Sequence, residues 1–118
     1  MVVVKRIVPN IAATRLDEID AFYQDLFDLE TVMDHGWILT KASKEKAVVQ
    51  LSIATEGGSG TPVPDISIEV DDVDAVYQRA MERGCAITYP LTDEDWGVRR
   101  FYLKDPAGKL LNVLSHQS

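Results

Sequence analysis

DISIEVDDVDAVYQRAMERG, residues 65–84, carries two different periodicities one after the other. Over 65–70, apolar and polar side chains alternate, which is typical of a strand with one buried face. Over 72–83, apolar residues recur at spacings of three and four, which predicts a helix, and Gly84 is a suitable residue to end it. The stretch therefore predicts a half-buried strand that leads directly into a helix.

The segments around this unit follow the same order in both halves of the chain. Apolar, β-branched or alternating runs bounded by turn residues predict further strands. The first half is predicted to hold a strand over 2–13, a helix over 17–29 and strands over 31–33, 37–41 and 47–54. The second half continues with strands over 86–89, 99–103 and 110–115. Each half thus has the order strand, helix, strand, strand, strand, and the DAFYQ of 20–24 returns as DAVYQ at 74–78.

Residues 56–64 separate the two halves. Three glycines and two prolines in nine residues disfavour any regular element, so we interpret the segment as a connector. We expect a first module over 1–56, a linker over 57–64 and a second module over 65–118, which together form one domain. Two such sheets placed side by side can enclose a cavity between their concave faces.

Composition and charge exclude several classes of protein. The 118 residues include 12 Lys or Arg and 19 Asp or Glu, a net charge of −7, which argues against a nucleic-acid partner. No apolar run approaches the roughly 20 residues that span a bilayer, and the basic residues of the N-terminus follow its short apolar run, unlike a secretory signal. We therefore expect a cytoplasmic protein without a membrane partner. With one cysteine, Cys85, and two histidines, neither an internal disulfide nor a Cys- or His-rich metal site can form within one chain.

Three segments resemble a known superfamily. FYQDLFDLE at 22–30, IEVDDVDA at 68–75 and WGVRRFYLKDPAG at 96–108 each resemble a segment of the glyoxalase, bleomycin-resistance and extradiol-dioxygenase proteins, also called the vicinal oxygen chelate superfamily. The resemblance implies an α+β fold in which two βαβββ modules place their mixed sheets around a cup-shaped cavity. It also implies a homodimer, in which the partner often completes the cup.

The resemblance also locates the metal ligands of metal-dependent members. It places them at Val8 or Asn10, Gln50 or Ser52, Asp65, and Asn112. Only one charged donor remains in this set, and divalent transition metals prefer imidazole, thiolate or carboxylate ligands. His116 has the strand parity of Asn112 and is an alternative donor. We therefore expect no metal cofactor, with a divalent metal as the alternative.

Strand parity indicates which side chains face the cavity. Asp65, Ser67 and Glu69 share one face of their strand, and the apolar residues between them need a helix against the other face. If Phe101 and Leu103 face the packed side, their neighbours face the cup, where Arg100 is expected to pair with Asp65 or Glu69. The expected ligand-binding residues are Trp37, Gln50, Ser52, Asp65, Ser67, Glu69, Trp96, Arg100, Tyr102 and Asn112, with Trp96 at the rim.

These expectations lead to one main hypothesis and two alternatives. The main hypothesis is a metal-free protein that sequesters a small organic molecule, aromatic or cationic, by aromatic stacking and acidic groups, with no catalytic residue. The first alternative is a lyase, isomerase or dioxygenase of the same superfamily, with an atypical metal or an acid–base site around Glu69. The second is a subunit whose cup is vestigial and whose role is assembly.

Overall fold

The computed structural model describes residues 9, 13–34, 37, 39–42 and 54–117. Most of the strand predicted over 2–13, nearly all of the strand predicted over 47–54, and the turn residue His35 lie outside these residues. The same is true of the candidate residues Val8, Asn10, Gln50 and Ser52. The expectations for these positions remain predictions.

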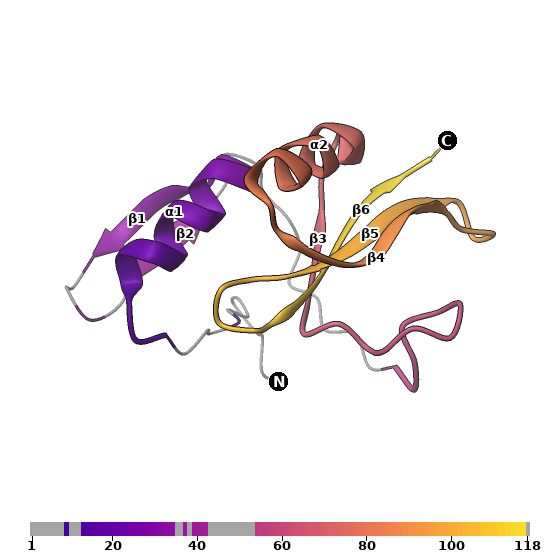
Figure 1. Ribbon diagram of the computed structural model, residues 1–118, viewed down its shortest axis with the longest axis horizontal. Coiled ribbons are helices and arrows are strands. Elements are labelled where there is room, and N and C mark those ends of the chain that lie inside the picture. Colours follow the sequence, from indigo (N-terminus) through magenta and orange to yellow (C-terminus); the bar gives the residue numbers. More distant parts are fainter. Residues whose placement is uncertain (1–8, 10–12, 35–36, 38, 43–53, 118) are drawn as a thin grey trace, which may run out of the picture.

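The described residues form two helices and two sheets (Figure 1). The first half contributes α1 (Leu16–Phe27), β1 (Glu30–Asp34) and β2 (Leu39–Ala42), and the second half contributes β3 (Ile66–Glu69), α2 (Val73–Arg83), β4 (Ala86–Asp93), β5 (Val98–Lys104) and β6 (Leu110–His116). β1 and β2 pair antiparallel. The second sheet has the order β3-β6-β5-β4, in which β3 runs parallel to β6 and the other pairs are antiparallel. The α+β class with a mixed sheet is confirmed, and the sheet is open.

The helix of the opening stretch forms where its sequence predicted it. The Asp72 side chain accepts a hydrogen bond from the Ala75 backbone N–H at 3.1 Å, which satisfies one of the free donors of the first turn. Gly84 ends α2 with φ of 75°, a conformation that favours glycine. α1 ends at Phe27, two residues earlier than predicted, because Asp28 adopts a left-handed conformation with φ of 54°.

One hydrophobic core joins the two halves. The buried face of α1, with Phe22, Tyr23 and Leu26, belongs to the same cluster as the inward-facing residues of α2, β5 and β6. The Tyr23 hydroxyl donates to the buried Asp105 carboxylate at 3.0 Å, and Arg79 on α2 donates to the Leu26 carbonyl at the end of α1 at 3.1 Å. A helix of the first half is thus packed on elements of the second.

The strand predicted over 86–89 is too short. β4 continues through Pro90 to Asp93, with irregular register against β5 on either side of Tyr89. β4 is the edge of the sheet, and an edge strand tolerates proline because one side of its backbone needs no ladder partner. The acidic segment 92–96 is therefore partly strand and partly the turn between β4 and β5.

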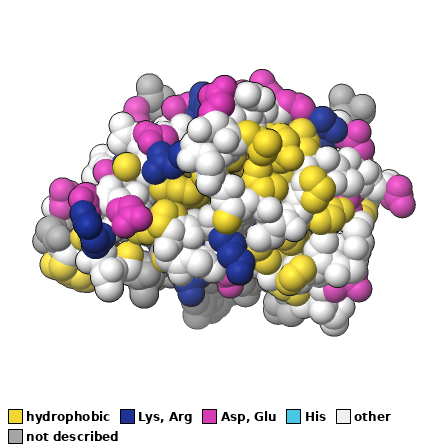
Figure 2. All heavy atoms as spheres, viewed as in Figure 1, with side chains coloured by type: hydrophobic (Ala, Val, Ile, Leu, Met, Phe, Trp, Pro, Cys, Tyr) yellow, Lys and Arg dark blue, Asp and Glu magenta, His cyan; other side chains and the backbone are white. Residues whose placement is uncertain are grey.

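The surface is charged around its edge. In the view of Figure 2, hydrophobic side chains gather near the middle of the face, and acidic side chains lie mainly toward the periphery. Within the described part of the chain, neither helix has the length and apolar character that crossing a membrane requires.

Candidate functional site

The sheet of the second half has one packed face and one polar face. Ile66, Ile68 and Val70 pack against the core, whereas Asp65, Ser67 and Glu69 are exposed on the other side of the strand. This is the alternation that the sequence predicted. On β5, Phe101 and Leu103 are fully buried in the core, and by alternation Arg100 and Tyr102 lie on the polar face.

Pairing of the strands aligns the polar side chains in a row across the sheet. Ser67 on β3 is opposite Asn112 on β6, which is opposite Tyr102 on β5, which is opposite Tyr89 on β4. The Asn112 side-chain amide donates to the Ser67 hydroxyl at 3.1 Å, and the rings of Tyr102 and Tyr89 lie 5.5 Å apart between centroids. The row continues diagonally to Arg100.

The connector between the halves packs on this row rather than passing freely over it. We call residues 56–62 the strap. Three successive residues of the strap, Gly58, Ser59 and Gly60, have positive φ values of 88°, 53° and 74°. The Gly57 N–H donates to the Thr61 carbonyl at 2.8 Å, so the strap folds back on itself. The expectation that this segment only connects the modules is therefore incomplete.

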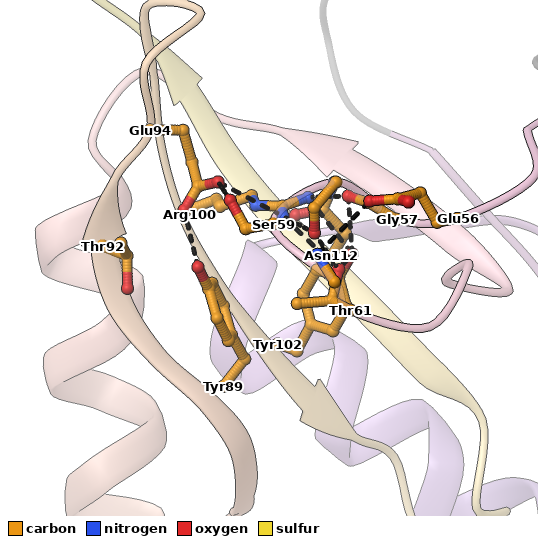
Figure 3. Close-up of polar contacts among 12 residues, drawn as sticks. Glu56, Gly57, Ser59, Thr61, Tyr89, Thr92, Glu94, Arg100, Tyr102 and Asn112 are labelled. Carbon is orange, nitrogen blue, oxygen red and sulfur yellow. Dashed lines mark hydrogen bonds and ion pairs between the residues drawn. The ribbon is translucent and has the colours of Figure 1, made fainter.

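Arg100 holds the strap through its backbone. The guanidinium is 3% exposed and donates to the Gly57 carbonyl at 2.6 Å and the Gly58 carbonyl at 3.2 Å (Figure 3). The Tyr102 hydroxyl lies 3.3 Å from the Gly57 and Pro62 carbonyl oxygens and 3.0 Å from Thr61 Oγ1. The strap is thus anchored on two buried side chains of β5.

The ion-pair partner of Arg100 is Glu94, not Asp65 or Glu69 as expected. Nη2 of Arg100 lies 3.5 Å from Oε2 of Glu94, and both side chains are almost fully buried. The turn after β4 brings Glu94 back over β5, whereas the Asp65 carboxylate accepts the Leu110 backbone N–H at 2.8 Å. Glu69 is paired with His116 at 3.1 Å, with both side chains 62% exposed.

Several groups stabilise the Glu94 carboxylate in its charged form. Burial raises the pKa of this carboxyl, but hydrogen bonds from Ser59 and Tyr89 and the positive charge of Arg100 together lower the pKa below its ordinary value. The Ser59 hydroxyl donates at 2.5 Å and the Tyr89 hydroxyl at 2.6 Å. Glu94 therefore ties β4, β5 and the strap together, as Figure 3 shows.

Trp96 stands at the edge of this cluster. Trp96 is 53% exposed, and the guanidinium carbon of Arg100 lies 5.1 Å from the centroid of the Trp96 ring. Gly58 lies so close to the indole that an added Cβ would be 2.7 Å from its Cη2 atom. The indole is therefore held in place on one side and open to solvent on another.

Trp37 lies elsewhere. It is 76% exposed on the connection between β1 and β2. No contact among the described residues joins it to Trp96 or Arg100, so this expected ligand-binding residue is not brought to the cluster within the described part of the chain.

Two buried polar atoms in the cluster lack partners within the described residues: Oδ1 of Asn112 and Nε of Arg100. Asn112 is 8% exposed, and its amide nitrogen donates to Ser67. Buried polar groups are normally hydrogen-bonded, so unpaired ones call for an explanation.

Asp65 and Asn112, the two metal positions of the superfamily that lie in the described part of the chain, do not suit a divalent transition metal. The Asp65 carboxylate accepts a backbone N–H, and Asn112 offers only a neutral amide oxygen, since its Nδ2 donates to Ser67. Across residues 9, 13–34, 37, 39–42 and 54–117, no three His, Cys, Asp or Glu side chains come together as a metal site would require. A neutral amide and one committed carboxylate are weak ligands for such an ion.

A shallow hollow lies at a different place, where the start of α1 meets the β5–β6 turn. Thr14, Arg15, Glu18, Pro106 and Ala107 are among its lining residues. None of these is a predicted ligand-binding residue. We therefore centre the candidate site on the polar face around Trp96, Arg100 and Asn112.

Several residues of the cluster were not predicted: Gly57, Gly58, Ser59, Thr61, Tyr89 and Glu94. Tyr89 could have been found, because its strand is next to β5 and an aromatic pair across two strands is common. The strap carried no such signal, since its contacts are made mainly by backbone carbonyls.

Comparison with known proteins agrees with this geometry. Residues 4–113 match the family model described as the Glyoxalase/Bleomycin resistance protein/Dioxygenase superfamily. The chain belongs to this superfamily. The match covers nearly the whole sequence and includes the three segments, 22–30, 68–75 and 96–108, that resemble the superfamily.

Solved structures with a similar fold share little sequence identity with this chain. TioX from Micromonospora sp. ML1 is 20% identical with a TM-score of 0.65, covering 97% of this chain and 98% of TioX. TnmS3, an antibiotic binding protein from Streptomyces sp. CB03234, is 22% identical with a TM-score of 0.64, covering 91% of each chain. Lactoylglutathione lyase from Agrobacterium tumefaciens is 21% identical with a TM-score of 0.59, covering 87% of each chain. At these identities the superfamily members share the fold with this chain.

An uncharacterized protein of Mycobacterium bovis is 45% identical over 49 residues, which are 42% of this chain and 32% of that protein. The match thus spans about a third of the length of the curated relative.

Proposed function

We propose that the polar face of the second sheet binds a small aromatic molecule and sequesters it without reaction. The observation that carries this proposal is the half-exposed Trp96 indole, held on the buried Arg100 and next to the strap. An aromatic ring fixed in advance loses little conformational entropy when a flat ligand stacks on it.

The charge of the cluster favours an aromatic ligand over a cationic one. Arg100 also lies 5.4 Å from the centroid of Tyr89 and 5.0 Å from that of Tyr102. The aromatic rings of this cluster thus already have a cation against them, and a second cation at the same rings would be repelled by the first. Of the two ligand classes expected from the sequence, we retain the aromatic one.

The comparisons support binding on this fold. TnmS3 is by its name an antibiotic binding protein, and its fold is that of this chain. The donor chemistry of Asp65 and Asn112 supports a mode of binding without a metal. For protein purified without chelator, we expect elemental analysis to find well below one Zn, Fe, Mn or Ni per chain.

One observation favours a second candidate function, an enzyme with an acid–base site. The imidazole of His116 and the carboxylate of Glu69 are 3.1 Å apart, an arrangement in which a carboxylate orients a base. Both side chains are 62% exposed, so neither is shielded from water as a catalytic base usually is. We therefore rank a lyase or isomerase second.

Replacement of Trp96 tests the proposed function. Trp96→Ala is expected to weaken binding of an aromatic probe such as 2-naphthol by about 1–3 kcal/mol, the range of an interface hot spot, while the unfolding midpoint changes little. Titration calorimetry measures the affinity. Trp37→Ala is the matched control, because it removes an exposed indole outside the cluster, and it should bind as the unchanged protein does. Equal losses in both variants, or none in either, would contradict the assignment.

A further inference from the structure

The two unpaired atoms of the polar face are a hydrogen-bond acceptor and a donor. Oδ1 of Asn112 has no donor and Nε of Arg100 has no acceptor within the described residues. The two residues are exposed over only 8% and 3% of their surface, so bulk water does not readily serve them. Leaving a buried polar atom unpaired destabilises the folded state.

The unpaired atoms belong to one face of two adjacent strands. Tyr102 is opposite Asn112 in the β5–β6 pair, and Arg100 is opposite Leu114, two residues further along. Arg100 and Asn112 are therefore diagonal neighbours on the same face, a separation that long side chains can bridge. The rest of the Asn112 amide is committed, since Nδ2 donates to Ser67.

The same cluster carries the Trp96 indole on which the proposed ligand stacks. Arg100 links the indole to the unpaired atoms. Its guanidinium lies against the Trp96 ring, and its Nε is one of the two unpaired atoms. A ligand that stacks on Trp96 is therefore also close to the side chain of Arg100, which lies at one end of the polar row.

We propose that the ligand of this face is a hydroxylated aromatic molecule, whose hydroxyl donates to Oδ1 of Asn112 and offers its oxygen to Nε of Arg100. A hydroxyl group is both donor and acceptor, so a single substituent class complements both atoms. The inference rests on the proposed function and adds the substituent that the ligand carries.

The strap is the entry route in this proposal. Oδ1 of Asn112 is itself covered, so a hydroxyl reaches it only when a neighbouring segment moves. The strap lies on the adjacent Tyr102, and it contacts β5 mainly through the carbonyls of Gly57, Gly58 and Pro62. An oxygen of the ligand can replace such a carbonyl as an acceptor from Arg100 or Tyr102.

Matched probes and variants test the proposal. The probes are 2-naphthol against 2-methoxynaphthalene and 6-hydroxyquinoline against 6-methoxyquinoline, which differ in the hydrogen-bond donor. We expect the 118-residue chain to bind each hydroxyl compound about three- to tenfold more tightly, the factor of one net hydrogen bond. Asn112→Leu should abolish this preference, and Ser67→Ala, which removes the partner of Nδ2 but leaves Oδ1, should retain it.

A second measurement needs no ligand. Because Asn112→Leu removes an unpaired buried oxygen, its unfolding midpoint is expected to equal or exceed that of the unchanged protein, whereas Ser67→Ala should lower the midpoint slightly. A midpoint for Asn112→Leu below that of Ser67→Ala would overturn the proposal.

The two proposals fail in different ways. Probes that bind through Trp96 with equal affinity for the hydroxyl and methoxy forms would overturn the hydroxyl inference and leave the proposed function standing. Failure of all four probes to bind the unchanged protein would count against both.

Discussion

Glu94 is the residue whose ionisation the cluster depends on. It accepts hydrogen bonds from Ser59 and Tyr89 and pairs with Arg100, and these three interactions favour its charged form. Its pKa is lowered in the folded protein, so the unfolded chain binds a proton more readily near the ordinary value of 4.5. The stabilisation it provides is therefore present above that pH and is lost as the pH falls through the folded-state pKa.

Glu94→Gln should reveal this dependence. At pH 7 we expect the variant to be less stable by about 1–3 kcal/mol, the range for a lost hydrogen bond to a charged group. The difference should shrink as the pH falls below the ordinary value of 4.5 and through the lowered folded-state pKa, because the carboxyl of the unchanged protein then becomes protonated. Denaturant unfolding at a series of pH values measures both effects.

Asp95→Asn is the control for this experiment, since it changes an exposed carboxylate in the same turn. The variant should lose stability at acidic pH as the unchanged protein does, so that the acid limb of its plot of unfolding free energy against pH is retained. An acid limb in Glu94→Gln as steep as that of the unchanged protein would show that Glu94 is not its source.

At the scale of elements, the strap depends on a close approach of its backbone to Trp96. Gly58 has φ of 88°, and a Cβ there would meet the indole at 2.7 Å and Nη2 of Arg100 at 3.4 Å. Gly58→Ala should therefore both strain the backbone and push the strap from the cluster.

For Gly58→Ala we expect a loss of about 1–3 kcal/mol of stability, with faster backbone hydrogen exchange confined to the strap and the β4–β5 turn. Gly60→Ala is the control, because it has φ of 74° but nothing within 4 Å of its Cβ. It should carry the backbone strain alone and leave exchange in the β4–β5 turn unchanged. Equal exchange behaviour in the two variants would argue against the contact with Trp96.

Periodicity in the sequence predicted the elements of the second half well. The alternation over 65–70 and the helical spacing over 72–83 both correspond to observed elements, because one face of each is buried in the shared core. The end of β4 was missed, since a proline normally ends a central strand and nothing local shows that this strand is at an edge.

The site was less predictable than the fold, for a physical reason. Strand parity placed Arg100 and Asn112 on the polar face. The ion-pair partner of Arg100, however, depends on the path of the turn between β4 and β5, which carries Glu94. Glu94 in the turn after β4 reaches the guanidinium, and β4 has register shifts on both sides of Tyr89 that its sequence does not reveal. Backbone carbonyls of the strap complete the site, and a carbonyl is present at every residue, so its use leaves no trace in composition.

At the scale of the whole molecule, exposed apolar side chains on the first half support an assembly. Val32 is 62% exposed on β1, and Trp37 is 76% exposed on the following connection. The two residues are five positions apart in the hairpin that β1 and β2 form, and exposed apolar residues that gather into one patch often mark protein interfaces. We propose that a second copy of the chain covers this pair, as the superfamily resemblance implied.

Light scattering should accordingly give twice the chain mass of 13.1 kDa at micromolar concentration. Val32→Lys combined with Trp37→Ser is expected to shift the mass toward that of one chain, because burial of a charge opposes association. Met81→Lys, which alters an exposed apolar residue on α2, should not. A mass of one chain for the unchanged protein would contradict the dimer.

The hydrogen bond between Tyr23 and Asp105 joins residues 82 positions apart, and β3 pairs with β6 across about 45 positions. Contacts so distant along the chain can form only after long loops have closed, and closing them slows the search for the native state. Although a glycine-rich connector divides the sequence into halves, the described core is built from residues of both halves. Folding of this protein should therefore be slow for its size and should occur as a single all-or-none event.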